Sequence, residues 1–434
     1  MQTFHRKTPP AIFTLLVVAC SGISSQTTPA GTLDPAFPRK AMEHVRHLSA
    51  LGPRLAGSPG ESKAAGYLRE RMEALGLEVR LEPFRILAFQ LESSFLKSGE
   101  ESAQIIRLGF NPFVDSQSIS GELAFVENTA NPGEVLETVL DGKIVVTTGR
   151  ANVMLLALFK QPAALAVVSD ADFQRLRAAK IQSGEVLTRG RHAELTSANV
   201  VGVLRSRAGS GKGIVLSAHL DSGSGPGASD NASGIGVLLE LARHYISLPQ
   251  GPGVTMRFVA FGAEEMGMVG ARSYLDLHAE ELRNCLLLFN IDTVGGSGTV
   301  FTDTRGGVRN IPPGVQSQFR ESFRERAMSD HEGRWFLLGP ELRALFDSSN
   351  VPPWLRDAVT EAAGVLGREV MAANGMGSDH RVFIQAGVVA TNIGISGSET
   401  HTADDVPERV NEASLETAGR IVSQVADRIA REPK

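Results

Sequence analysis

One stretch, residues 213–234, constrains the fold and function of this chain more than any other; it reads GIVLSAHLDSGSGPGASDNASG. It begins with an apolar run that is typical of a buried strand in a parallel sheet. His219 and Asp221 follow that strand, and a loop rich in Gly, Ser and Pro leads to Asp230. Because open α/β sheets bind ligands at the carboxyl ends of their strands, the pattern predicts a site at one edge of a sheet.

Strands and helices are predicted to alternate along the rest of the chain. An amphipathic helix follows Asp230, with Ser233 as its predicted cap. The next predicted strands are MRFVAFG, CLLLFNI and VVATNIGIS, and helical spacing predicts a helix over GARSYLDLHAEEL and another over the last 20 or so residues before the C-terminus. The alternation predicts an α/β fold with a mostly parallel central sheet that is flanked by helices.

Length, charge and cysteine content narrow the possible functions. A chain of 434 residues is too long for one core, which favours two domains. The net charge is −5, without a long basic run or a nucleic-acid-binding motif, so nucleic acid is not expected as a partner. Only Cys20 and Cys285 occur, which excludes a disulfide framework and a Cys-based metal site. Any metal ion must therefore be held by His, Asp and Glu.

The first 20 residues have the pattern of an export signal. A basic start precedes a short apolar core, AIFTLLVVA, which is too short to span a bilayer. The core ends at Cys20, and VVAC resembles the lipobox of bacterial lipoproteins; an ordinary cleaved signal is the alternative. Residues 21–35 are predicted to be a flexible tether. We expect an exported protein, either in the bacterial cell envelope or secreted, with membrane contact only through this lipid anchor.

Five candidate metal ligands follow predicted strands, directly or in the loops beyond: His219, Asp230, Glu265, Asp292 and His401. Imidazole and carboxylate together favour zinc or a similar ion over calcium and magnesium, which prefer oxygen ligands alone. Two His and three carboxylates exceed the needs of one open tetrahedral site, and they suit two ions about 3.5–4 Å apart that share a carboxylate. Glu264, beside one ligand, is a candidate general base.

Six motifs occur in the order HLDS, GASDNASG, FGAEEMG, NIDTVG, GSDH and THTADD. Together they resemble the co-catalytic zinc exopeptidases of family M28, over about residues 41–430 apart from an insert. The resemblance implies the zinc-exopeptidase (phosphorylase/hydrolase-like) fold and two zinc ions, with Co or Mn as possible substitutes. By the resemblance His219 and Asp292 hold one zinc, Glu265 and His401 hold the other, and Asp230 bridges them.

The resemblance also assigns roles to residues near the ligands. Asp221 would orient His219, in the way that metal-bound imidazoles usually have a carboxylate partner. Glu264 would be the general acid and base, while Asp379 and His380 of the GSDH motif would line the substrate cleft. Asp405 matches the aspartate of the family's HTxxD pattern and, with Asp404, is expected to orient the loop of His401.

The insert separates two parts of the predicted catalytic domain. The N-terminal segment HVRHLSALGPRLAGSPGESKAAGYLRERMEALGLEV resembles the start of M28 peptidases, so residues 36–96 and 198–434 are predicted to form the peptidase domain. Residues 97–197 contain short strand-like pieces and resemble a degenerate protease-associated (PA) domain, a smaller β-rich unit. We expect no catalytic group there. Residues 301–353 have weak periodicity and are predicted to form loops near the cleft mouth.

The predicted reaction is the removal of N-terminal residues from peptides. Two zinc ions would lower the pKa of a shared water, and Glu264 would take its proton and deliver it to the leaving amine. A carboxypeptidase or dipeptidase is the alternative, although no Arg is clearly placed to bind a carboxylate; the candidates are Arg381, Arg305 and Arg309. A glutaminyl cyclase-like enzyme and a non-catalytic binding ectodomain are further alternatives, and the complete ligand set argues against both.

Overall fold

The computed structural model describes most of the chain beyond the N-terminus. The described residues are 32–108, 116–127, 139–151, 162–207, 209, 211–223, 225–303, 327–329, 335–337, 351–373, 377–397 and 399–431. The described residues from Leu33 onward form one compact unit. The predicted signal with Cys20, and Arg305 and Arg309, lie outside the described residues, as does most of the segment 301–353. Among the helices that are described, none has both the length and the apolar character needed to cross a membrane.

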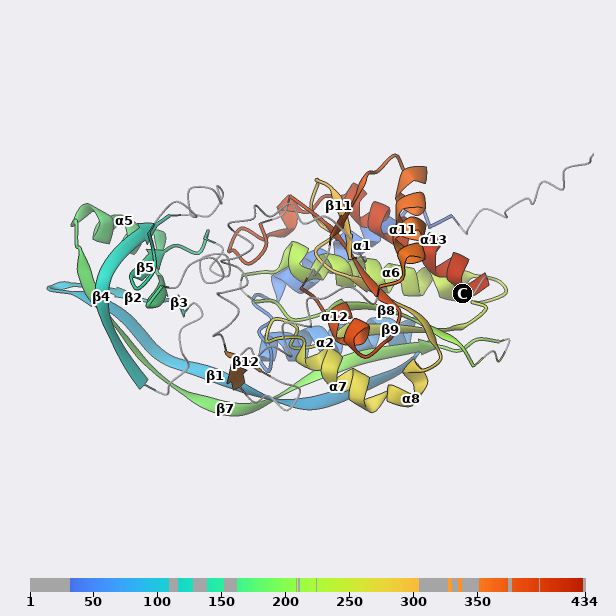
Figure 1. The fold of residues 1–434 in the computed structure, drawn as a ribbon, viewed down its shortest axis with the longest axis horizontal. Coiled ribbons are helices and arrows are strands. Elements are labelled where there is room, and N and C mark those ends of the chain that lie inside the picture. The colour runs from blue at the N-terminus through green and yellow to red at the C-terminus, as the bar shows by residue number, and fades with distance from the viewer. Residues whose placement is uncertain are drawn as a thin grey trace, which may run out of the picture. The chain divides into compact units, whose positions relative to one another are not determined.

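A mixed sheet runs through this unit (Figure 1). Its strand order is β14-β11-β15-β10-β8-β9-β7-β4-β5-β6-β3, with β1 paired to β7 and β2 paired to β1. The central strands β15, β10, β8 and β9 are parallel, whereas β7 is antiparallel to β9. The strands are β1 Glu78–Ser98, β2 Glu101–Gln104, β3 Arg107–Leu108, β4 Ser116–Val126, β5 Ile144–Thr147, β6 Ala164–Val167, β7 Ser183–Leu204, β8 Gly213–His219, β9 Thr255–Phe261, β10 Cys285–Ile291, β11 Val300–Asp303, β14 Val370–Ala373 and β15 Ala390–Ile395, with a separate pair β12 Ala327–Ser329 and β13 Trp335–Leu337.

Helices cover both faces of the parallel strands. They are α1 Phe37–Ala50, α2 Pro59–Ala74, α5 Asp170–Ala178, α6 Gly234–Ser247, α7 Val269–Leu277, α8 Ala279–Leu282, α11 Pro353–Val365, α12 His380–Gln385 and α13 Glu412–Arg431, with the short helical turns η1 Ala228–Ser233 and η4 Pro407–Arg409. The chain passes from β8 through α6 to β9 on one side, and then through α7 back across β8 to β10. Since parallel crossovers are right-handed, this reversal places α6 and α7 on opposite faces.

Two local predictions need correction. Ser233 precedes α6 as predicted, but its side chain makes no cap hydrogen bond; it donates instead to the carbonyl of Ser229. The predicted single helix after β9 is divided at His278, whose backbone leaves the helical region. The imidazole of His278 contacts Glu82 of β1 at 2.9 Å, so a long-range contact interrupts the helix there.

Strands β1 and β7 are much longer than the sequence pattern predicts. They pair antiparallel from Glu78 opposite Val203 to Lys97 opposite Glu185, with an irregularity near Leu91. Both strands run through the predicted domain boundaries at residues 97 and 197, and β4 adds to the far part of β7. Local alternation predicts only the start of such a strand, because its length depends on the partner.

Separate hydrophobic clusters lie at the two ends of the long strand pair β1–β7. The large cluster is formed by β8, β9, β10 and β15 together with α1, α2, α6 and α13. A smaller cluster lies where β1 and β7 meet β5, β6 and α5, and it contains Leu96, Ile144, Phe173 and Val186. The large core holds the carboxyl ends of the parallel strands in fixed register, and these ends carry the predicted ligands.

Candidate metal centre

The predicted ligands come from four neighbouring strands. His219 is the last residue of β8, and Asp230 lies in η1, at the end of the loop that follows. Glu265 follows β9, Asp292 comes directly after β10, and the loop after β15 brings His401. The chain reverses its direction of winding between β8 and β10, and ligands of open α/β sheets bind where this reversal occurs.

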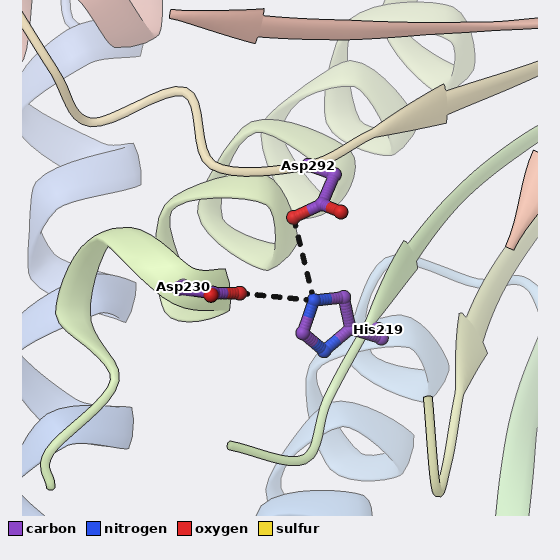
Figure 2. A group of neighbouring side chains, drawn as sticks. All are labelled: His219, Asp230 and Asp292. Carbon is purple, nitrogen blue, oxygen red and sulfur yellow. Dashed lines mark ion pairs between the residues drawn. The ribbon is translucent and has the colours of Figure 1, made fainter. Parts of the chain in front are cut away.

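Asp230 lies between two imidazole rings. Its Oδ1 atom is 3.1 Å from Nε2 of His219, and its Oδ2 atom is 3.0 Å from Nε2 of His401. Nε2 of His219 also lies 3.4 Å from Oδ1 of Asp292, and Figure 2 shows the three side chains converging from β8, η1 and the end of β10. On the other side, Nδ1 of His401 is 3.6 Å from Oε2 of Glu265.

These contacts define two groups with metal-ligand geometry. One group is His219, Asp230 and Asp292, and the other is Asp230, Glu265 and His401; within each, the ligand atoms lie within 4.8 Å of one another. Asp230 belongs to both groups. Imidazole and carboxylate donors at this spacing fit zinc, and the shared carboxylate fits two cations. The five predicted ligands are thus brought together by the fold.

Burial and neighbouring charges shift the pKa values of several groups in this centre. Burial by itself lowers the pKa of His219, but Asp292, Asp221 and Asp230 outweigh burial and raise it well above its ordinary value. Burial also acts on Glu265 and raises its pKa to about 7. For Asp230 burial is outweighed by hydrogen bonds with the two imidazoles, which lower its pKa. Carboxylates that require positive neighbours in this way suit a divalent cation.

Asp221 holds the segment that carries Glu264 and Glu265. Its Oδ1 accepts a hydrogen bond from the backbone N–H of Glu264 at 3.0 Å, and its Oδ2 accepts one from Glu265 at 3.1 Å. Oδ1 also lies 3.5 Å from Nδ1 of His219, while the same nitrogen is 3.2 Å from the carbonyl oxygen of Asp221. Asp221 is fully buried, and its carboxylate contacts candidate ligands that follow two different strands.

Asn231 links the segment of Asp230 to the end of β10. Its Nδ2 donates to the carbonyl of Ile291 at 2.9 Å, and its Oδ1 accepts from Gly234 at 2.9 Å and from Thr293 at 3.1 Å. Two of these partners flank Asp292. The side chain therefore connects the backbone next to one candidate ligand, Asp230, to the backbone on both sides of another, Asp292.

Backbone strain concentrates beside the ligands. Ala263, Thr293 and His401 have φ between +54° and +59°, in the left-handed region that non-glycine residues rarely adopt. Ala263 precedes Glu264, Thr293 follows Asp292, and His401 is itself a candidate ligand. Each such conformation costs about 1–2 kcal/mol, and strain of this kind is typical of functional sites.

Glu264 and Asp379 are two further acidic groups close to the centre. Burial raises the pKa of each carboxyl group well above its ordinary value, although the charge of His219 acts to lower both pKa values. The charge of Asp379 raises the pKa of Glu264 further. Asp379 is fully buried, and its carboxylate makes no hydrogen bond with any described residue. His380 and Arg381 are fully buried as well, so none of these three side chains offers accessible surface.

Three residues that the sequence does not single out contribute to the site. Arg54 contacts the loop between His219 and Asp230. Gly223 donates its N–H to Oε1 of Glu265 at 2.6 Å, and a Cβ there would lie 2.6 Å from Oε2 of that carboxylate. Asn231 is the third. Arg54 lies more than 160 residues from the loop carbonyl groups that it contacts, and no local pattern indicates its role.

Comparison with known proteins finds similarity to peptidases. The model of peptidase family M28 matches residues 199–331, which hold four of the five candidate ligands. The aminopeptidase YwaD of Bacillus subtilis (strain 168) is 27% identical, with 92% of this chain and 87% of the relative covered. The probable lipoprotein aminopeptidase LpqL of Mycobacterium tuberculosis (strain ATCC 25618 / H37Rv) is 24% identical over 63% of each chain.

Residues 199–331 of this chain match peptidase family M28. Solved structures show the same fold: the zinc aminopeptidase BSAP from Bacillus subtilis has a TM-score of 0.60 at 23% identity, with 89% of this chain and 93% of that chain covered. The aminopeptidase from Aneurinibacillus sp. strain AM-1 has a TM-score of 0.58 at 21% identity, covering 91% and 94%. The M28 fold places the carboxyl ends of β8, β9 and β10 where the ligand groups lie.

Proposed function

We propose that this protein is a zinc-dependent aminopeptidase that removes N-terminal residues from peptides, with two zinc ions and Glu264 as general base. The enzyme class is metallo-aminopeptidase, as the family and its named relatives indicate. The observation that carries the rest of the proposal is the position of Asp230 between His219 and His401.

The proposed metal assignment follows the two ligand groups. His219 and Asp292 would hold one zinc ion, Glu265 and His401 the other, and Asp230 would bridge them. The site fits because each group combines one imidazole with carboxylates, all buried or half-buried. When bound, zinc supplies Lewis acidity, which lowers the pKa of water and polarises a carbonyl group.

Glu264 is proposed to move the proton. A general base works best when its pKa is near the operating pH, and burial raises the pKa of this carboxylate from its low ordinary value. Its backbone is fixed by Asp221 and by the left-handed turn at Ala263. The carboxylate would accept a proton from the attacking water and return it to the amine that leaves.

The experiment that tests the proposal follows which end of a peptide is shortened. The purified protein is incubated with unblocked peptides, with the same peptides acetylated at the N-terminus, and with a chelator control, and the products are identified by mass spectrometry. Shortening from the amino end that both acetylation and the chelator abolish is expected. Shortening from the carboxyl end would contradict the proposed polarity, and an unchanged peptide in the presence of bound zinc would contradict peptide hydrolysis.

We also propose that the protein is exported and carries a lipid at Cys20. The support is the basic start, the short apolar core and the VVAC sequence. Labelling of the expressed protein with a radioactive fatty acid tests this: label is expected on the native chain and not on a Cys20→Ser variant. Equal label on the two chains would contradict the anchor.

The domain division also remains our proposal: a tether over residues 21–35, a peptidase domain over 36–96 and 198–434, and a PA-like insert over 97–197. Its support is the separate small core at the far end of β1 and β7. Limited proteolysis tests the division, because a separately packed insert is expected to be released or trimmed as a unit.

A further inference from the structure

We propose that Arg54 is a positioning residue of the metal centre, whose guanidinium ties together the two ends of the loop between His219 and Asp230 and so sets the zinc affinity of the group His219, Asp230 and Asp292. This inference rests on the proposed zinc site. It concerns a side chain outside both ligand groups, which comes from the turn between α1 and α2.

Three side-chain contacts of Arg54 lie at the two ends of that loop, and a fourth runs from Nη1 to the carbonyl of Leu48 in α1 at 3.4 Å. Nε donates to the carbonyl of Leu220 at 2.9 Å, directly after His219. Nη1 donates to the carbonyl of Pro226 at 2.6 Å, and Nη2 donates to that of Gly227 at 2.9 Å, just before η1. The planar fork of a guanidinium can satisfy carbonyl groups from different directions at once, which an ammonium group cannot do in the same geometry.

The backbone of Arg54 adds a second tie to the same loop. Its N–H donates to Oγ of Ser222 at 2.9 Å, and its carbonyl accepts from the N–H of Ser222 at 3.2 Å. Gly227 adopts φ +59°, and a Cβ at this position would lie 2.9 Å from Nη2 of Arg54. The carbonyl oxygen of Asp230 and Cβ of Ser222 would each lie 2.6 Å from the same Cβ, so glycine at this position lets the loop pack closely against Arg54 and against itself.

Burial and charge explain why an arginine suits this place. Arg54 is fully buried. Burial lowers its pKa to about 10, against the opposing influence of Asp221, Asp405 and Asp230, so the side chain stays charged at neutral pH. A buried cation that faces carbonyl groups and several carboxylates stabilises a cluster of acidic ligands before any metal ion binds.

Three variants test the role. Arg54→Met removes the guanidinium fork, and Arg54→Lys keeps the charge without the fork. Tyr245→Phe is the matched control, because it removes the hydrogen bond from the hydroxyl of another buried side chain to Oδ1 of Asp427. Zinc affinity and stoichiometry are measured by competition with a chelator, and hydrogen exchange of residues 220–233 is measured on the zinc-free protein.

Substitution of groups that support metal ligands typically lowers metal affinity about 10–100-fold. We expect a loss of that size for Arg54→Met, a smaller but clear loss for Arg54→Lys, and faster exchange in residues 220–233, while Tyr245→Phe matches the unmodified chain. If Arg54→Met does not fold, Arg54→Lys decides by the same criteria.

A His401→Ala background shows which ligand group is affected. Only the group of His219, Asp230 and Asp292 then keeps all its ligands, and Arg54→Lys is expected to lower zinc affinity in that background as well. Unchanged zinc affinity in a folded Arg54 variant would overturn the inference, and so would full recovery by Arg54→Lys, which would reduce the role to charge. If the unmodified chain itself bound no zinc, the proposed function would fail instead.

Discussion

Asp405 holds the backbone of Asp230 in place. Its Oδ2 accepts a hydrogen bond from the N–H of Asp230 at 3.0 Å, and its Oδ1 accepts one from the preceding Ser229 at 2.6 Å. The same residue's carbonyl accepts from Ala228 at 3.2 Å. Asp405 lies four residues after His401, so it connects the loop of one proposed ligand to the residue that is shared by both groups.

This connection predicts the effect of Asp405→Asn. An amide nitrogen would replace one acceptor and face a backbone N–H, so the segment of Asp230 would shift. We expect zinc affinity to fall about 10–100-fold, measured by chelator competition. Asp404→Asn is the matched control, because the neighbouring side chain is 40% exposed and makes a long ion pair with Arg409. Equal losses in the two variants would argue against the specific role of Asp405.

Glu264→Gln separates metal binding from proton transfer. The substitution keeps the shape of the side chain, and Asp221 contacts only the backbone of this residue. We therefore expect bound zinc to stay the same and kcat to fall by about 10²–10⁴-fold, the usual contribution of a general base. Metal analysis and steady-state kinetics on one preparation check this. Substantial remaining turnover would remove Glu264 from the mechanism.

Zinc is expected to stabilise the folded protein, with His219 as one of the ligands that this stabilisation requires. A ligand that binds only the folded state at 100 times its Kd adds about 2.7 kcal/mol to the free energy of unfolding. The melting temperature of the unmodified protein should therefore rise with added zinc. His219→Ala should lose bound zinc and most of this rise, whereas His47→Ala, on α1 at the surface, should retain both. An unchanged zinc content in His219→Ala would exclude it as a ligand.

The raised pKa of Glu61 predicts that the free energy of unfolding depends on pH. Burial and the charge of Asp221 raise its pKa to about 8, against hydrogen bonds from Ser197 and Gly57. At a pH between 4.5, the ordinary pKa of this carboxyl group, and about 8, its pKa in the folded state, the folded protein binds more protons than the unfolded protein. The free energy of unfolding therefore falls as the pH rises through this range.

Glu61→Gln cannot titrate, so its free energy of unfolding should fall less steeply with pH. Urea denaturation of the zinc-free protein at about pH 5 and about pH 8 measures the slope. Glu43→Gln is the control, because this carboxylate is 56% exposed and pairs with Arg39 on the surface of α1. Parallel slopes for Glu61→Gln and the unmodified protein would contradict the assignment.

The sequence predicts the elements around the site well because the relevant signals are local. Apolar runs mark β8, β9 and β10. His219 ends the first of these strands, Glu264 and Glu265 lie in the loop after the second, and Asp292 directly follows the third, in patterns that resemble family M28. The carboxyl ends of parallel strands meet at one edge of a sheet, so strand exits alone predict that these side chains lie close together. The roles of Glu264 and the metal ligands remain predictions for the experiments above.

The sequence by itself therefore determined the α/β class, the ligand candidates and their order, since each depends on neighbouring residues. Tertiary structure alone decided how those ligands are held. Arg54 and Ser222, Asp405 and Ser229, and the paired lengths of β1 and β7 join segments that lie far apart in the chain. Hydrogen bonds between distant segments leave no periodicity in either one, so their partners become known only when the chain is folded.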